Sequence, residues 1–167
     1  MFPTIQRSGY VLLLLAVLAG CTKTKGYGPK STNEPTIPVT VQNAVDYRPD
    51  PTVTTSLTDS SIKIVLSIPS ASGRTIKEIT KVATSSSYAQ IQSTGTTGFY
   101  TTAPIAASGT SVTFTTSIAA YYVNKPKTST NPAPKVDAEL TFRYYLLLTL
   151  DDGTTIVTEP VRVLVTS

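Results

Sequence analysis

The side chains that most enzymes use for proton transfer and nucleophilic attack are scarce in this sequence. Its 167 residues include one cysteine and no histidine. A Ser-His-Asp triad, a Cys-His dyad and a histidine metal site are therefore excluded. Paired carboxylates could still support hydrolysis, and the adjacent Asp151 and Asp152 come nearest to such a pair. Because Gly153 follows them, we interpret these acids as turn residues.

The same two carboxylates could bind calcium together with Asp137 or Glu139, but no loop has the EF-hand spacing. Ser70-Ala71-Ser72-Gly73 lacks the glycine pattern and the lysine of a phosphate-binding loop. We therefore expect no catalytic residues, no metal site and no cofactor, and hence a protein that is not an enzyme.

Aromatic side chains are the remaining candidates for binding, because exposed rings stack on sugars and anchor protein partners. Tyr144 and Phe142 fit a core pattern. Five others fall near predicted strand ends or loops and are candidate partner-binding aromatics: Tyr88, Phe99, Tyr100, Tyr121 and Tyr122. Packing in the core or at its rim is the alternative for these five.

The lone thiol, Cys21, follows an apolar run at residues 10–18 that comes after a segment with one positive charge, Arg7, and no acid. This arrangement is typical of a signal peptide. The run is too short for a retained transmembrane helix, which needs about 20 apolar residues. No second cysteine exists to pair with Cys21, so an exported free thiol would be open to oxidation unless it were blocked.

Leu18-Ala19-Gly20-Cys21 resembles the lipobox of bacterial lipoproteins, a leucine and two small residues before a cysteine. The resemblance implies lipidation of Cys21, cleavage between Gly20 and Cys21, and attachment to a membrane through the lipid. Two or three acyl chains hold a protein firmly. Thr22 and the absence of acids after Cys21 favour the periplasmic face of the outer membrane over the cell surface. An incidental thiol in an ordinary signal peptide is the alternative.

The formal charge of +4 is mild, and the basic residues are scattered rather than clustered. We therefore expect no nucleic-acid partner. Three segments are predicted: a signal peptide at 1–20, the lipidated cysteine and a flexible polar tether at 21–38, and one β-sandwich domain at 39–167.

Alternating apolar residues predict about seven to nine strands separated by turn residues, as in a two-sheet sandwich. The clearest lie at 37–41, 62–68, 112–118 and 140–150, with shorter candidates at 53–57, 88–92 and 99–101. Ile76, Ile79 and Val82 fit helical spacing as well as a bulged strand, and their β-branched side chains favour the strand. Residues 124–135 read as a polar, proline-containing loop.

The last 28 residues read as a strand, an Asp-Gly turn and a second strand that Pro160 interrupts. This ending resembles the final hairpin of small Ig-like or fibronectin-III-like lipoproteins of Bacteroidota. The resemblance implies an all-β, Ig-like antiparallel sandwich. The paired cysteines and core tryptophan of antibody domains are missing, and the fold hosts many functions.

Two hypotheses for function remain. The first is a membrane-anchored, non-catalytic β-sandwich that binds or organises an envelope protein or a polysaccharide. The second is a structural or assembly subunit in which an exposed strand edge pairs with a neighbouring chain. An unpaired, uncharged edge strand would favour the second.

Overall fold

The computed structural model describes residues 36–167 except 96, 102 and 108. The predicted signal peptide, the predicted lipobox and nearly all of the predicted tether lie outside this described part. Its strands are β1 Thr40–Val41, β2 Thr52–Ser56, β3 Ser61–Ser67, β4 Ile76–Ser85, β5 Ile105–Ala106, β6 Ser111–Ser117, β7 Ala138–Glu139, β8 Arg143–Leu150, β9 Thr155–Val157 and β10 Arg162–Thr166. The helical elements are the 3-10 turn Ser70–Ser72, α2 Ala89–Gln92 and α3 Ile118–Asn124.

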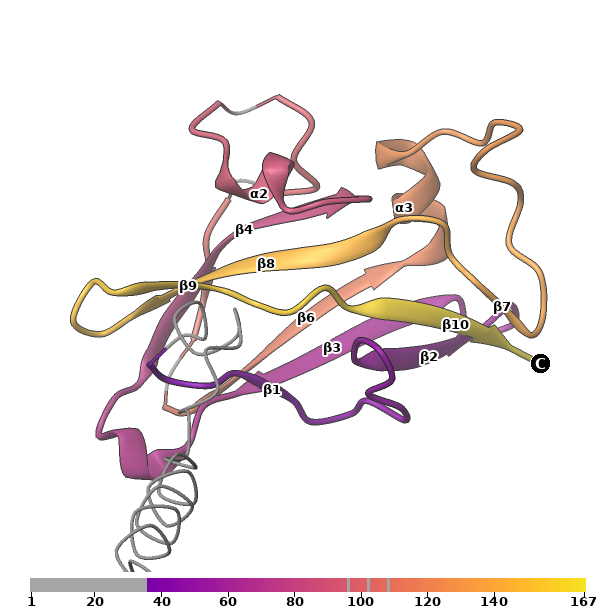
Figure 1. Cartoon of the computed structure of the whole chain (residues 1–167). Helices are drawn as coiled ribbons and strands as arrows, with labels where there is room; N and C mark the ends of the chain where they lie inside the picture. Colours follow the sequence, from indigo (N-terminus) through magenta and orange to yellow (C-terminus); the bar gives the residue numbers. More distant parts are fainter. Residues whose placement is uncertain (1–35, 96, 102, 108) are drawn as a thin grey trace, which may run out of the picture. The chain divides into compact units, whose positions relative to one another are not determined.

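The strands form two facing layers (Figure 1). One layer is the antiparallel sheet β1-β3-β6, and the other contains the sheet β5-β4-β8-β9. β10 continues the second layer, since Val161 pairs with Tyr144 of β8 before β10 joins β2 in parallel and β7 in antiparallel pairing. The all-β sandwich predicted from the sequence is confirmed.

The main core lies between the layers. Alternation in β3 and β6 turns Ile62, Ile64 and Phe114 inward, where each is nearly inaccessible to solvent. From the opposite layer, Leu146 and Leu148 of β8 meet them. Burial of these side chains is the main term that stabilises the domain, because the sequence offers no disulfide.

The segment with ambiguous spacing is the strand β4, as the sequence favoured. Its pairing with β8 shifts register between Ile76 and Glu78 and again between Ile79 and Lys81. Each bulge inserts one extra residue, so side chains three apart fall on the same face. Ile76, Ile79 and Val82 therefore all belong to the main core.

The outer face of β4 and β8 carries a second, smaller core. Ala83, Tyr145, Ile91 and Phe99 are buried there together. The cover comes from the segment between β4 and β5, of which α2 contributes Ile91 and lies above β4 and β8 (Figure 1). The prediction of a strand at 88–92 is wrong, because Tyr88 to Gln92 turn inward as a short helix that places Ile91 on this cluster. At 99–101 only Thr101 pairs, in an isolated bridge to Val82.

The strand β6 ends at Ser117, although the apolar alternation in the sequence continues to Ile118. Ser117 accepts a hydrogen bond from the backbone N–H of Ala120 and thereby caps α3, which starts at Ile118. Val112, Phe114 and Ile118 remain on the core side. The predicted terminal hairpin is present only in part: β9 pairs with β8 and Val161 still bridges Tyr144, but β10 then pairs with β2 and β7 instead of β8. Gly153 in the turn has a positive φ of 85°.

Candidate functional site: a free strand edge and an aromatic cluster

The strand β6 has one strand partner among the described residues, β3. The hydrogen bonds that flank this pairing show which backbone groups face β3. Ile68 N–H donates to Thr110 at 2.9 Å, and Ile118 N–H donates to Ser60 at 2.9 Å. Since antiparallel pairs alternate, the even-numbered residues of β6 bond to β3 and the odd-numbered residues face away. The backbone N–H and C=O groups of Thr113 and Thr115 therefore form an unpaired edge within the described part of the chain.

The side chains of this edge are all uncharged. Val112 and Phe114 point into the core, whereas Ser111, Thr113 and Thr115 are exposed on the outer face. The strand contains no proline and no glycine. It therefore lacks the features that natural edge strands use to prevent pairing with another chain.

The other sheet edges in the described residues are shorter or interrupted. β1, β5 and β7 have two residues each, Pro104 precedes β5, and β7 includes Glu139. β9 has three residues and is followed by Pro160. β2 follows Pro51, and its first residue pairs with Asp46 of the preceding loop. The edge of β6 is therefore the longest one free to accept a strand.

A second candidate is the aromatic cluster over the outer face of β8. The ring of Tyr88 meets that of Tyr145 edge to face, with 4.8 Å between centroids. Tyr145 is buried, but Tyr88 is 40% exposed. Lys81 Nζ lies 4.6 Å from the centroid of Phe99 and donates to the carbonyl of Ser93 at 2.8 Å. This lysine helps to fix the cover over the second core.

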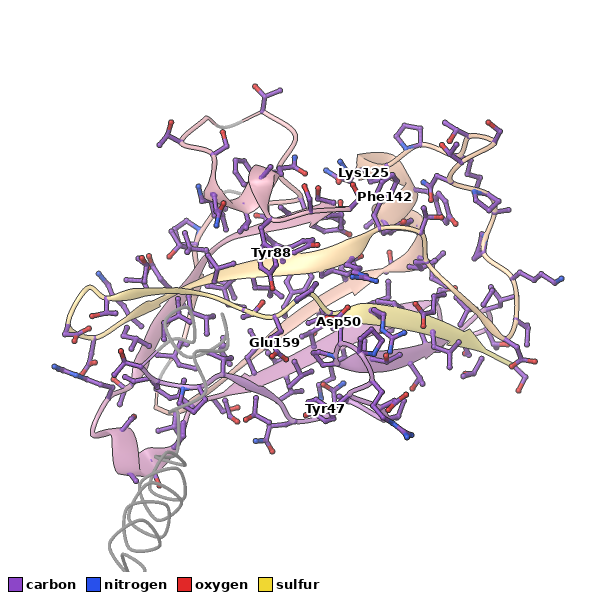
Figure 2. The ribbon with its side chains drawn as sticks, in the orientation of Figure 1. Tyr47, Asp50, Tyr88, Lys125, Phe142 and Glu159 are labelled. Carbon is purple, nitrogen blue, oxygen red and sulfur yellow. The ribbon has the colours of Figure 1, made fainter. Side chains whose placement is uncertain are left out.

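Charged groups lie near Tyr88. Arg143 Nη1 lies 2.9 Å from Asp50 Oδ2. Burial raises the pKa of Tyr88, and the nearby Tyr145 and the carboxylates of Glu159 and Asp50 raise it further. Figure 2 shows Tyr88, Asp50 and Glu159 on the viewer's side of β8 and β10. An exposed ring next to hydrogen-bonding acids and an arginine is suited to contact a polar ligand such as a sugar.

The five candidate aromatics do not form one surface. Phe99 and Tyr121 are buried, so the prediction that they are available to a partner is wrong. Tyr100 is half-buried and packs edge to face on Phe114 and Tyr144. Tyr122 is half-buried as well, with its hydroxyl bonded to the carbonyl of Pro132 at 2.6 Å. Of the five, only Tyr88 is exposed.

The buried Tyr121 has a structural role. Its hydroxyl accepts from the backbone N–H of Phe142 at 2.9 Å and donates to Asn131 Oδ1 at 3.2 Å. Asn131 is itself buried, and its amide donates to the carbonyl of Lys125 at 2.8 Å. Tyr121 thus ties α3 and the polar loop at 124–135 to the start of β8. Burial raises its pKa to about 12.

Two of the four acidic residues considered as calcium ligands, Asp152 and Glu139, form ion pairs with arginines. Arg74 Nη2 lies 3.0 Å from Asp152 Oδ2, and Arg162 Nη1 lies 2.7 Å from Glu139 Oε1. The backbone N–H of Thr154, which donates to Asp152, lowers the pKa of that carboxyl. Within the described residues no group of three or more candidate ligands gathers around a common point.

Comparison with known proteins identified no relative of this chain. No family model, curated protein or solved structure matches the chain. Cys21 and the lipobox residues Leu18, Ala19 and Gly20 lie outside the described residues. Within residues 36–167, leaving out the three gaps, no helix has the length and apolar character to cross a bilayer.

The free edge was missed at the sequence level. The sequence predicts a strand at 112–118, but edge position depends on which strands pair, and pairing is not visible in one sequence. The available signal was the run Ser-Val-Thr-Phe-Thr-Thr-Ser, which has high β propensity and neither charge nor proline.

Proposed function

We propose that this chain is a membrane-anchored, non-catalytic lipoprotein whose β-sandwich joins an envelope assembly by pairing its β6 edge with a strand of another protein chain. One observation carries the proposal: β6 presents the outward backbone groups of Thr113 and Thr115 along an edge of seven uncharged residues. In strand addition these groups supply the affinity, and the alternating side chains supply the specificity.

The membrane location in this proposal rests on the lipobox Leu18 to Cys21 and on the apolar run before it. We place the protein at the outer membrane, with the periplasmic face favoured by Thr22 and the absence of acids after the cysteine. A lipid anchor concentrates the domain near other envelope proteins. This proximity supports strand pairing, because a short exposed edge binds weakly in dilute solution.

The proposal is tested by photo-crosslinking in intact membranes. A photoreactive amino acid replaces Thr115 in the full chain, and the matched control carries it at Thr155, an exposed threonine of β9 in the other layer. We expect a protein adduct of defined mass from position 115 and none from position 155. If position 115 yields no protein adduct, or the same adducts as position 155, pairing at this edge is ruled out.

A polysaccharide is the second candidate partner, and the exposed Tyr88 beside Asp50 and Glu159 is the observation that favours it. If this cluster binds glycans, Tyr88→Ala should remove binding on an envelope-glycan array. Tyr47→Ala removes an exposed tyrosine from the 42–51 loop and serves as the control, which should bind normally. Equal binding by both variants would exclude this site.

A further inference from the structure

We infer that the strand that pairs with β6 is the β6 strand of a second copy of this chain, in antiparallel, two-fold register centred on Phe114. This inference rests on the proposed function and names its partner. It requires an edge that is complementary to itself, since a two-fold interface brings the same surface of both copies together.

The amino-acid sequence of β6 has this self-complementarity. The strand reads Ser-Val-Thr before Phe114, and it reads Ser-Thr-Thr when followed backwards from Ser117 to Phe114. The two halves therefore have similar residues at the same distance from Phe114. In the two-fold register Ser111 faces Ser117, Val112 faces Thr116, and Thr113 faces Thr115 of the other copy. Every cross-strand pair joins residues of similar size, the valine, threonine and phenylalanine residues have high β propensity, and threonine pairs stabilise antiparallel strands.

The direction of the backbone N–H and C=O groups of β6 also agrees with this register. Thr113 and Thr115 direct their backbone groups away from β3, and the register places these two residues opposite each other in the two copies. They can therefore exchange both N–H to C=O bonds as a hydrogen-bonded pair, with Phe114 at the non-bonded position on the axis. A shift of one residue would place inward-facing groups opposite outward-facing ones and lose these bonds.

The charges near the edge allow two copies to meet. No charged side chain lies in β6, and the nearest one along the sheet is Lys63 of β3, opposite Thr115. In the paired sheet each Lys63 lies one strand back from the seam. No like charges therefore face each other across the junction. Natural edge strands that resist pairing carry lysine in the edge strand itself.

The entry point of the chain leaves the edge accessible. The segment that links Cys21 to the domain leads into β1, and β1 and β6 lie at opposite edges of the same sheet. Joining two copies gives the order β1-β3-β6-β6-β3-β1, in which the two β1 strands are about 24 Å apart. The first strand of each copy then lies at an outer side of the joint sheet, away from the seam.

The test uses charge exchange in the full chain, expressed as two differently tagged copies and co-captured from membranes in mild detergent. One variant carries Thr113→Lys and Thr115→Lys, and the other carries Thr113→Glu and Thr115→Glu. The control carries Thr54→Lys and Thr155→Lys, which add the same charge to exposed threonines of β2 and β9.

We expect wild-type copies to capture each other, and the lysine and glutamate variants each to lose self-capture by about tenfold or more, because like charges then face each other across the seam. Mixing the lysine and glutamate variants should restore capture, which a folding defect could not do. The control should behave as the wild type.

Self-capture by the lysine variant at the wild-type level, or mixed capture no stronger than that of either variant alone, would overturn the inference. Should Thr115 crosslink to a different envelope protein while wild-type copies fail to capture each other, the second-copy inference falls and the proposed function stands. Should Thr115 crosslink to nothing, both fall.

Discussion

Two tyrosine hydroxyls are buried in the main core, and they differ in whether they have hydrogen-bond partners. Tyr121 bonds to the backbone of Phe142 and to Asn131. The hydroxyl of Tyr144 is buried without a partner among the described residues. A buried polar group without a partner loses its hydration and gains nothing in return. The two residues therefore contribute to stability with opposite sign.

We predict that Tyr144→Phe raises the free energy of unfolding by about 1 kcal/mol, whereas Tyr121→Phe lowers it by about 1–3 kcal/mol. Both variants keep the ring that packs in the core, so the hydroxyl alone is tested. Urea denaturation of the two variants beside the wild type measures the difference. A loss of stability in Tyr144→Phe equal to that in Tyr121→Phe would show that the Tyr144 hydroxyl is paired.

The same hydroxyls predict instability in alkali. The pKa of Tyr121 is raised from 10.0 to about 12 by burial, and burial also raises that of Tyr144. Above pH 10 the unfolded chain releases tyrosine protons that the folded chain retains, so the unfolded state binds fewer protons. The stabilisation is complete below pH 10 and is lost as the pH rises to about 12. Thermal melts across this range should show the fall, and Tyr121→Phe should make it shallower.

At the scale of elements, the second core shows how a short helix can be held by tertiary packing. The four residues of α2 are too few to be stable alone. Ile91 and Phe99 pack on Ala83 and Tyr145, and Gln92 N–H donates to the carbonyl of Tyr88 at 3.3 Å. The cover at 86–100 and the outer face of β8 therefore depend on each other.

Ile91→Ala should open this cover without unfolding the sandwich. Its side chain is 1% exposed but lies outside the main core, so we expect new protease cleavage within 86–98 and a small change in melting temperature. Ile64→Ala, at the centre of the main core, should cost about 2–5 kcal/mol of global stability. Limited proteolysis with mass mapping separates the two effects. A large global loss in Ile91→Ala would mean that the second core is part of the main folding unit.

Sequence patterns predicted strands well where one face is buried and poorly where tertiary contacts decide the conformation. Ile62 to Ile68 and Leu140 to Leu150 alternate clearly, and both contain strands. The segment at 88–92 has no clear apolar alternation. Its helix is stabilised because Ile91 packs on buried side chains of β4 and β8. The burial of Phe99 and Tyr121 could not be predicted, because residues distant in the sequence pack against them. The edge of β6 was hidden for the same reason.

At the scale of the whole molecule, the proposal joins an anchor at Cys21 to a domain with one long free edge. Cys21→Ser should abolish incorporation of labelled fatty acid, since the thioether needs the sulfur. Thr22→Ser, which keeps the cysteine, should incorporate label normally. Mass spectrometry of the purified wild-type protein should find a lipid-modified Cys21 as the first residue. Unmodified Cys21, or another first residue, would remove the anchor from the proposal.

The parallel pairing of β2 with β10 joins the beginning of the domain to its end. The hydroxyl of Thr166 donates to the carbonyl of Thr55, 111 residues away in the sequence. A nascent chain consequently cannot complete this sheet until residues 162–166 have been synthesised, and such distant pairing slows folding. In the exported precursor that we propose, this late closure would delay folding of the domain and so favour passage through the membrane in an unfolded form.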